Sequence, residues 1–245
     1  FWWELRSCAY YDAFEQPKII YQVIQFYARY CLDLDGRLSN DKTFFLPTDD
    51  PWLLACLNSP LMWWHNWRHL THLKDEALSP MGYKVSVLPI AAPSAASQEA
   101  TARHVADIVA HTKSASHATS STLDWLRHEF ELAKPGRDLA NLTALDGECF
   151  ISAVRSALPK KRKLTAAEIA ELKREHGVTV EPARQARAQI FALERQLSDL
   201  VNEAYGLTPA EVDLMWRTAP PRMPFTPAGL QLPESFVDPE PTDEE

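Results

Sequence analysis

The sequence predicts an α+β protein in which a mixed-sheet lobe is followed by a helical lobe with one long, heptad-patterned helix. Three observations lead to this prediction. Short apolar, β-branched and aromatic runs alternate with turn signals up to about residue 92. Apolar residues between 93 and 158 recur at helical spacing, and a heptad pattern follows from Ala183 to Ala204.

Four runs in the first zone are typical of strands. Lys18–Tyr21 and Thr43–Leu46 are apolar, rich in β-branched and aromatic residues, and end at turn residues or proline. Leu32–Gly36 reads as a strand that runs into a turn, and Val85–Pro89 is the fourth candidate.

Between these runs, residues 49–70 predict two helical pieces. Asp50 can cap the first piece and Ser59 the second, and each is followed by a proline, which is tolerated at the first helical position because its missing amide has no partner there. The buried stripe of the pair is expected to consist of Leu53, Leu54, Leu57, Leu61 and Trp64.

The second zone predicts two helices with a loop between them. Val105, Ile108 and Val109 carry the spacing of the first helix, and Leu123, Leu126 and Phe130 that of the second. The segment from His111 to Ser121 is rich in Ser, Thr and Ala and is interpreted as the loop, and Pro135-Gly136 is expected to end the second helix.

The third zone has the clearest periodicity. Its apolar positions step by three and four residues, which is typical of a helix packed lengthwise on another helix; they are Ala183, Ala186, Ile190, Leu193, Leu197, Leu200 and Ala204. The predicted partner is a helix from Thr165 to His176, opened by a Thr165/Glu168 capping box. Gly206 is expected to end the long helix, and Thr208/Glu211 to open a last short one.

The predicted organisation is therefore linear: part of a recognition domain over residues 1–92, a helical region over 93–219, and a Pro-rich acidic tail over 220–245 that we expect to be disordered. The net charge of −8 is unevenly spread, because residues 234–245 hold six acids and no base. Without them the chain has a net charge of −2, which is compatible with a basic face but does not indicate one.

Composition narrows the class of protein. No apolar run approaches the roughly 20 residues that span a bilayer, and the first residues show no signal peptide. Four scattered cysteines without a Cys-x-x-Cys pair are typical of reduced thiols in the cytoplasm. Since the chain begins at Phe1 rather than Met, we expect it to be part of a longer protein.

Several catalytic patterns are missing from the sequence. There is no Gly-rich turn of the Rossmann type, no P-loop, and no Asp/Asn-Pro-Pro-aromatic motif for methylating an extruded base. The one Pro-Pro pair, Pro220-Pro221, lies between Ala219 and Arg222. We also find no spaced Asp…Glu-x-Lys set of a magnesium nuclease, so whether this chain is an enzyme is left open.

The opening stretch carries a family resemblance. The residues are Trp3–Arg6, Phe14–Tyr21, Asp33–Gly36, Leu53–Ser59 and Val87–Ile90, with a further likeness in Leu200–Thr208. In this order they resemble the TaqI-like C-terminal specificity domain of Type II restriction-modification adenine-N6 DNA methyltransferases. The resemblance covers roughly residues 1–92. It implies that the chain begins partway into the specificity domain.

The resemblance implies a recognition domain that reads duplex DNA outside the methylase cleft. It also implies an upstream methyltransferase domain that uses S-adenosylmethionine, with no cofactor in this chain. We therefore expect sequence-specific double-stranded DNA recognition in service of adenine-N6 methylation, with or without an endonuclease, and hence a role in phage defence. The alternative is a helical assembly subunit of a phage-defence complex that does not bind DNA.

Candidate DNA contacts fall in three places. Arg6 and Lys18 lie in the family-like motif, where they contact phosphate or guanine or else form ion pairs with Glu4, Asp12 or Glu15. The second place is a polar loop between strands with Arg37, Asn40 and Lys42, which is either a reading loop or a solvated turn. The third is a basic stretch that contacts the DNA backbone or is simply solvated, namely Lys160, Lys161, Arg162 and Lys163.

A histidine and tryptophan cluster completes the candidates. His65, His69 and His72 share one helical face, as zinc ligands at i and i+4 do, but no Cys or acid nearby completes a site. Trp63, Trp64 and Trp67 interleave with them, so we expect packed or surface histidines, no metal, and an aromatic group that belongs to the core or stacks an extruded base.

Overall fold

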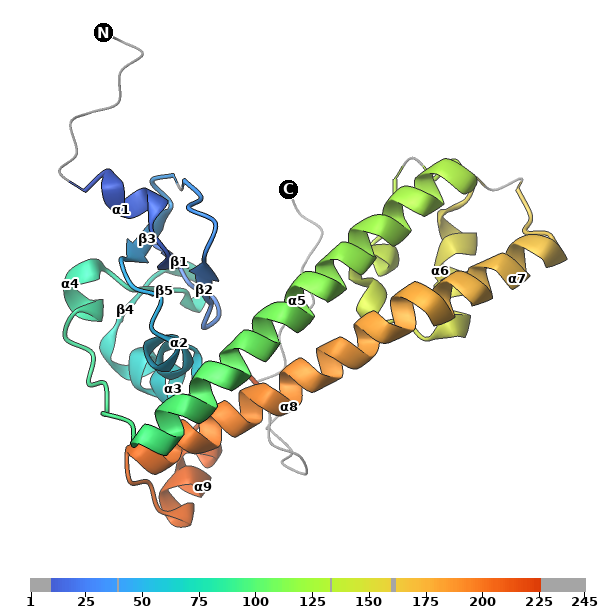
Figure 1. The fold of residues 1–245 in the computed structure, drawn as a ribbon. Coiled ribbons are helices and arrows are strands. Elements are labelled where there is room, and N and C mark those ends of the chain that lie inside the picture. The colour runs from blue at the N-terminus through green and yellow to red at the C-terminus, as the bar shows by residue number, and fades with distance from the viewer. Residues whose placement is uncertain (1–9, 39, 133, 160–161, 226–245) are drawn as a thin grey trace, which may run out of the picture. The chain divides into compact units, whose positions relative to one another are not determined.

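The computed structural model describes residues 10–38, 40–132, 134–159 and 162–225 (Figure 1). The chain divides into two compact units. Unit 1 comprises residues 1–102 and 196–245, and unit 2 comprises residues 103–195. The chain passes from unit 1 to unit 2 within helix α5 and returns within helix α8.

Unit 1 contains a three-stranded sheet. Its central strand β1 (Lys18–Gln22) pairs with β2 (Tyr30–Asp33) on one side and β3 (Thr43–Leu46) on the other. Both pairings are antiparallel, with Ile19 opposite Leu32 and Leu46. The α+β class is thus confirmed, but the sheet is antiparallel rather than mixed. The seven residues between β1 and β2 are too few for a parallel crossover.

Two short helices follow the sheet as the sequence predicts. In α2 (Pro51–Asn58) the Asp50 side chain accepts the amide of Trp52, and in α3 (Pro60–His69) the Ser59 hydroxyl accepts that of Met62. Each helix has its proline at the first position. The two helices pack most of their apolar side chains into unit 1, with Leu57 and Trp63 almost fully buried.

A small hairpin comes next. Strand β4 (Thr71–His72) pairs antiparallel with β5 (Leu78–Ser79) across a turn that contains the 3-10 helix η1 (Lys74–Glu76). The predicted strand Val85–Pro89 is wrong, because Val85 instead ends helix α4 (Gly82–Val85). The amides of Val85 and Ser86 bond back to Met81 and Gly82, and this local bonding prevails over the β-propensity of the two valines.

Helix α5 (Ala95–Glu129) is one uninterrupted helix of 35 residues. The loop predicted over His111–Ser121 is therefore wrong. Alanine is the best helix former, and the polar residues between the alanines can satisfy their hydroxyls on the helix itself, as Thr119 Oγ1 does at 2.9 Å from the carbonyl of Ala115.

In unit 2 helix α7 (Ala166–Glu175) leads without a loop through a π-helical turn, η3 (His176–Val180), into α8 (Glu181–Ala204). The Thr165/Glu168 capping box is confirmed. The predicted pairing of this helix against the heptad seam is wrong, since a helix that continues into the next cannot fold back on it. The residues of η3 and its flanks keep helical backbone angles.

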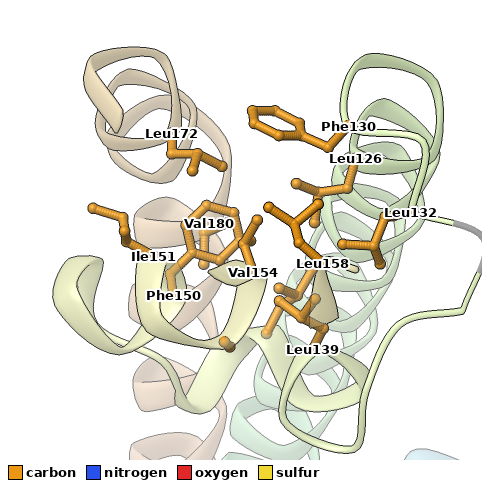
Figure 2. Close-up of a cluster of buried hydrophobic side chains, with 12 residues drawn as sticks. Leu126, Phe130, Leu132, Leu139, Phe150, Ile151, Val154, Leu158, Leu172 and Val180 are labelled. Carbon is orange, nitrogen blue, oxygen red and sulfur yellow. The ribbon is translucent and has the colours of Figure 1, made fainter. Parts of the chain in front are cut away.

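The core of unit 2 lies where α5, α6 (Gly147–Ala157) and α7 meet (Figure 2). Side chains from the three helices point toward one another there, joined by Leu139 and Leu142 of the 3-10 segment η2 (Asp138–Ala144). The fully buried members include Leu126, Phe150, Val154 and Leu172. Unit 2 therefore has an apolar core of its own.

The chain ends in unit 1 with α9 (Pro209–Arg217), which follows Gly206 at φ +67° and opens with the predicted Thr208/Glu211 capping box. Residues 220–225 do not belong to a disordered tail. Trp63 Nε1 donates to the carbonyl of Pro221 at 2.9 Å, and Met223 packs in two apolar clusters. The rest of the predicted tail, 226–245, lies outside the described residues.

The observed units differ from the linear order that the sequence predicts. Unit 1 is built from both ends of the chain, because residues 196–225 return to pack beside α2 and α3. In the described part of the chain no helix is both long and apolar enough to cross a membrane.

Candidate nucleic-acid interface

Lys18, a predicted DNA contact, is fully buried. Its Nζ lies 2.6 Å from Oδ2 of Asp33 and donates to the carbonyl of Phe14 at 2.7 Å. Asp33 in turn accepts the amides of Asp35 at 3.1 Å and Arg37 at 2.8 Å. The ion-pair alternative therefore describes Lys18, although its partner is none of the three acids that the sequence suggested. Its charge holds α1 (Asp12–Glu15) and the turn after β2 onto the sheet and is not available to DNA.

The environment of Asp33 keeps it ionised. Burial alone raises the pKa of this carboxyl, but the hydrogen bonds from Lys18, Asp35 and Arg37 outweigh it, so the pKa lies below the ordinary value. The turn that these bonds build needs a glycine, because Gly36 has φ +67° and a Cβ there would lie 3.0 Å from the carbonyl oxygen of Glu15.

The predicted reading loop is exposed but locally neutralised. Arg37 pairs with Asp35 at 2.8 Å and Lys42 with Asp41 at 3.0 Å, and both basic side chains are about three-quarters exposed. Asn40 Oδ1 accepts the amide of Lys42, as in a polar turn. The solvated-turn alternative therefore fits the geometry. Arg6 lies outside the described residues.

The described residues of the basic stretch after α6 differ in their surroundings, because Arg162 is bonded within unit 2 and Lys163 is exposed. Arg162 donates to the carbonyl of Phe130, and its Nη2 lies 3.0 Å from Oε1 of Glu168. It also lies over the Phe130 ring, 5.6 Å from the centroid. Arg162 therefore fastens this loop to the core of unit 2. Lys163 is exposed, and Lys160 and Lys161 lie outside the described residues.

His65 and the tryptophans of α3 are buried or half-buried, whereas His69 and His72 are exposed. The rings of His65 and His69 stack at 4.3 Å, and His72 Nε2 lies 2.6 Å from the carbonyl of Trp67. Burial, and after it the charge of His69, lower the pKa of His65. Among the described residues no three His, Cys, Asp or Glu side chains are grouped so as to hold a metal. Trp63 belongs to the core.

A base-rich surface lies beside these aromatics, at the end of α3 and on the β4–β5 hairpin. We call it the hairpin face and define it by six side chains: Arg68, His69, His72, Lys74, Lys84 and Arg222. Hydrogen bonds connect parts of it. Lys84 Nζ donates to Thr71 Oγ1 of β4 at 2.7 Å, and Arg222 reaches the carbonyl of Asp75 at 3.4 Å.

Neutral oxygens position three cations of the hairpin face, namely Arg68, Lys84 and Arg222. Arg68 donates to the carbonyls of Trp64 and Thr218 at 2.8 and 3.0 Å, with its guanidinium 3.7 Å from the centroid of the Trp64 ring. In the described chain neither Arg68 nor Lys84 forms an ion pair with a carboxylate. Such groups are oriented while their charge remains available for an anion, which distinguishes them from Arg37 and Lys42.

Two acids interrupt the hairpin face. Asp75 and Glu76 occupy the turn between β4 and β5 with φ values of 58° and 60°. Both central positions are thus left-handed, as in a type I′ turn, where Asn-Gly is preferred. Glutamate there is strained, and its carboxylate lies on the same hairpin as the cations.

Sequence reasoning missed most of the hairpin face, although a signal was present. From Pro51 to Lys74 the chain has no acidic residue, while it has Arg68, Lys74 and three histidines. Lys84 and Arg222 join this surface only through folding, because Arg222 is nearly 150 residues away from the hairpin along the chain.

Comparison with known proteins adds one match. A family model described as a domain of unknown function (DUF8810) matches residues 94–201, which is less than half of the chain. The matched residues include all of unit 2 and none of the sheet and hairpin of unit 1. No curated protein and no solved structure matches the chain.

Proposed function

We propose that this chain binds duplex DNA as the specificity part of an adenine-N6 DNA methyltransferase, and that the hairpin face of unit 1 contacts the phosphates. The observation that carries the proposal is the set of cations on this face that neutral oxygens orient, above all Arg68 and Lys84. The resemblance of residues 1–92 to TaqI-like specificity domains supports the same reading.

The chemistry of the face suits a phosphate backbone. Four Lys and Arg side chains stand against two carboxylates on its hairpin. Phosphate contacts fix the position of a protein on DNA, while contacts to base edges select the sequence. In this proposal the methyl transfer and its S-adenosylmethionine belong to an upstream domain.

The first test is the salt dependence of binding. The full chain is titrated onto a fluorescein-labelled random duplex of 25 base pairs at several salt concentrations, with anisotropy as the readout. We expect log affinity to fall linearly with log salt, by about 0.9 per phosphate contact. A flat response, or no binding at low salt, would contradict the proposal and favour the assembly-subunit alternative.

The second test locates the contact with two matched variants. K74Q/K84Q removes two cations from the hairpin face, and R37Q/K42Q removes two from the predicted reading loop. If both lysines contact phosphate, K74Q/K84Q reduces the salt slope by about 1.8 and weakens binding roughly 60-fold at 0.1 M salt. R37Q/K42Q should leave both quantities almost unchanged, because Asp35 and Asp41 already neutralise these side chains. The reverse pattern would place the contact on the loop.

Sequence specificity needs its own measurement. The full chain is used to select from a duplex library with a randomised central region. A recurrent short sequence is expected after several rounds, with Arg68→Gln weakening binding to selected and random duplexes alike if that arginine touches only phosphate. Salt-dependent binding without any enrichment would show a DNA-binding chain that does not read sequence.

A further inference from the structure

The two units carry opposite charge. Unit 2, residues 103–195, has 15 Lys and Arg against 12 Asp and Glu, whereas the rest of the chain has 10 against 21. The protein is therefore acidic only outside unit 2. Because the whole chain has a net charge of −8, a polyanion is repelled at long range, and its attraction to unit 2 depends on individual exposed cations at short range.

Within unit 2 the bases concentrate on one stretch. Between Glu148 and Glu168 there is no acidic residue, and there are five basic ones. Two of these, Arg155 on the last turn of α6 and Lys163 before α7, are exposed in the described structure and pair with no carboxylate there. We use the name α6–α7 surface for these two exposed side chains, Arg155 at the end of α6 and Lys163 before α7.

The described residues next to Lys163 are anchored in unit 2. Leu158 is buried in the core cluster, and Leu164 packs against the same cluster. Between them Arg162 bonds to the carbonyl of Phe130 at the end of α5 and to Glu168 of α7. Both sequence neighbours of Lys163, Arg162 and Leu164, are thus held by contacts within unit 2.

We propose that the α6–α7 surface is a second contact for the phosphates of a nucleic acid, on unit 2 and separate from the hairpin face. The identity of the polyanion rests on the proposed function of unit 1, because a DNA duplex supplies a regular row of phosphates with one charge per roughly 1.7 Å of helix axis. An acidic protein surface is the competing partner, and the test includes it.

The test uses the full chain and the labelled duplex described above. Arg155 and Lys163 contribute nothing to the core, so R155Q/K163Q should keep the thermal midpoint of the parent. If both residues contact phosphate, the salt slope falls by about 1.8 and affinity at 0.1 M salt falls roughly 60-fold. The matched control is K113Q, which neutralises an exposed lysine in the middle of α5 and should change neither quantity.

A variant with the opposite effect sharpens the result. Glu129 and Glu131 flank Phe130, whose carbonyl Arg162 binds, and both are exposed. E129Q/E131Q should therefore tighten binding and steepen the salt dependence, since it removes repulsion beside the same surface. Unchanged affinity in both double variants would overturn the inference.

The possible outcomes separate the two proposals. Binding that weakens in K74Q/K84Q but not in R155Q/K163Q keeps the proposed function and overturns the second contact. Absence of DNA binding by the parent chain overturns the proposed function, and the second contact with it. If R155Q/K163Q leaves DNA binding intact but abolishes binding to labelled poly-glutamate, the surface recognises acidic protein and the inference is overturned.

Discussion

Lys18 in unit 1 and Arg162 in unit 2 are both candidate DNA contacts by sequence, and in the structure each holds parts of its own unit together. Lys18 is fully buried against Asp33, with every bond made inside the protein. Arg162 lies at the edge of an apolar core, with about a third of its side chain exposed. The comparison teaches that a cation paired with a carboxylate beside an apolar core serves folding, whereas exposed Arg68, which pairs with no carboxylate in the described chain, can still meet an anion.

The largest test of this comparison is Lys18→Met. The variant leaves the carboxylate of Asp33 buried without its partner, and breaking a buried ion pair in this way costs about 3–5 kcal/mol. Urea unfolding followed by tryptophan fluorescence measures the loss. Lys42→Met removes an exposed pair and should change the free energy of unfolding by less than about 0.5 kcal/mol. Equal losses of stability in the two variants would show that the buried Lys18–Asp33 pair contributes no more than the exposed Lys42–Asp41 pair.

The pH dependence of stability sharpens the same point. Because the pKa of Asp33 is lowered in the folded state, its stabilisation is complete above the unfolded pKa of about 3.9 and is lost as the pH falls through the lower folded value. The free energy of unfolding should therefore differ between the parent and Asp33→Asn most at neutral pH. The difference should shrink below pH 4. A difference that stays constant down to pH 2 would contradict the ionised state.

Arg162→Gln is expected to have a smaller effect than Lys18→Met. It removes one ion pair and one bond to a backbone carbonyl at a partly exposed site, which corresponds to about 1–2 kcal/mol. Hydrogen exchange should show faster exchange around the start of α7, with the sheet of unit 1 unaffected. An effect as large as that of Lys18→Met would mean that the bonds of Arg162 to Glu168 and Phe130 stabilise the protein as much as the buried Lys18–Asp33 pair does.

A smaller effect than that of Arg162→Gln, and one of opposite sign, is expected from D75N/E76G. Asn-Gly suits the left-handed turn of the hairpin, so the free energy of unfolding should rise by about 0.5–1 kcal/mol. The same variant removes two carboxylates from the hairpin face and should strengthen DNA binding at low salt. Higher stability with unchanged DNA affinity would show that the turn is strained but that its two carboxylates do not lie near bound DNA.

The sequence by itself determined the elements with strong local signals. The strands Lys18–Gln22 and Thr43–Leu46, the Asp50 and Ser59 caps, both capping boxes and the Gly206 stop all lie where it predicted them. Each depends on groups a few residues apart, whose hydrogen bonds form within one turn or strand. The α+β class followed from these elements.

Only the tertiary structure decided the long-range features. The single helix α5, the continuity of α7 with α8, the return of residues 218–223 to unit 1, and the burial of Lys18 each depend on partners far along the chain or on packing. For the same reason the hairpin face could not be assembled from spacing. A charge is free or paired according to what folding brings beside it, and the order of residues does not record that.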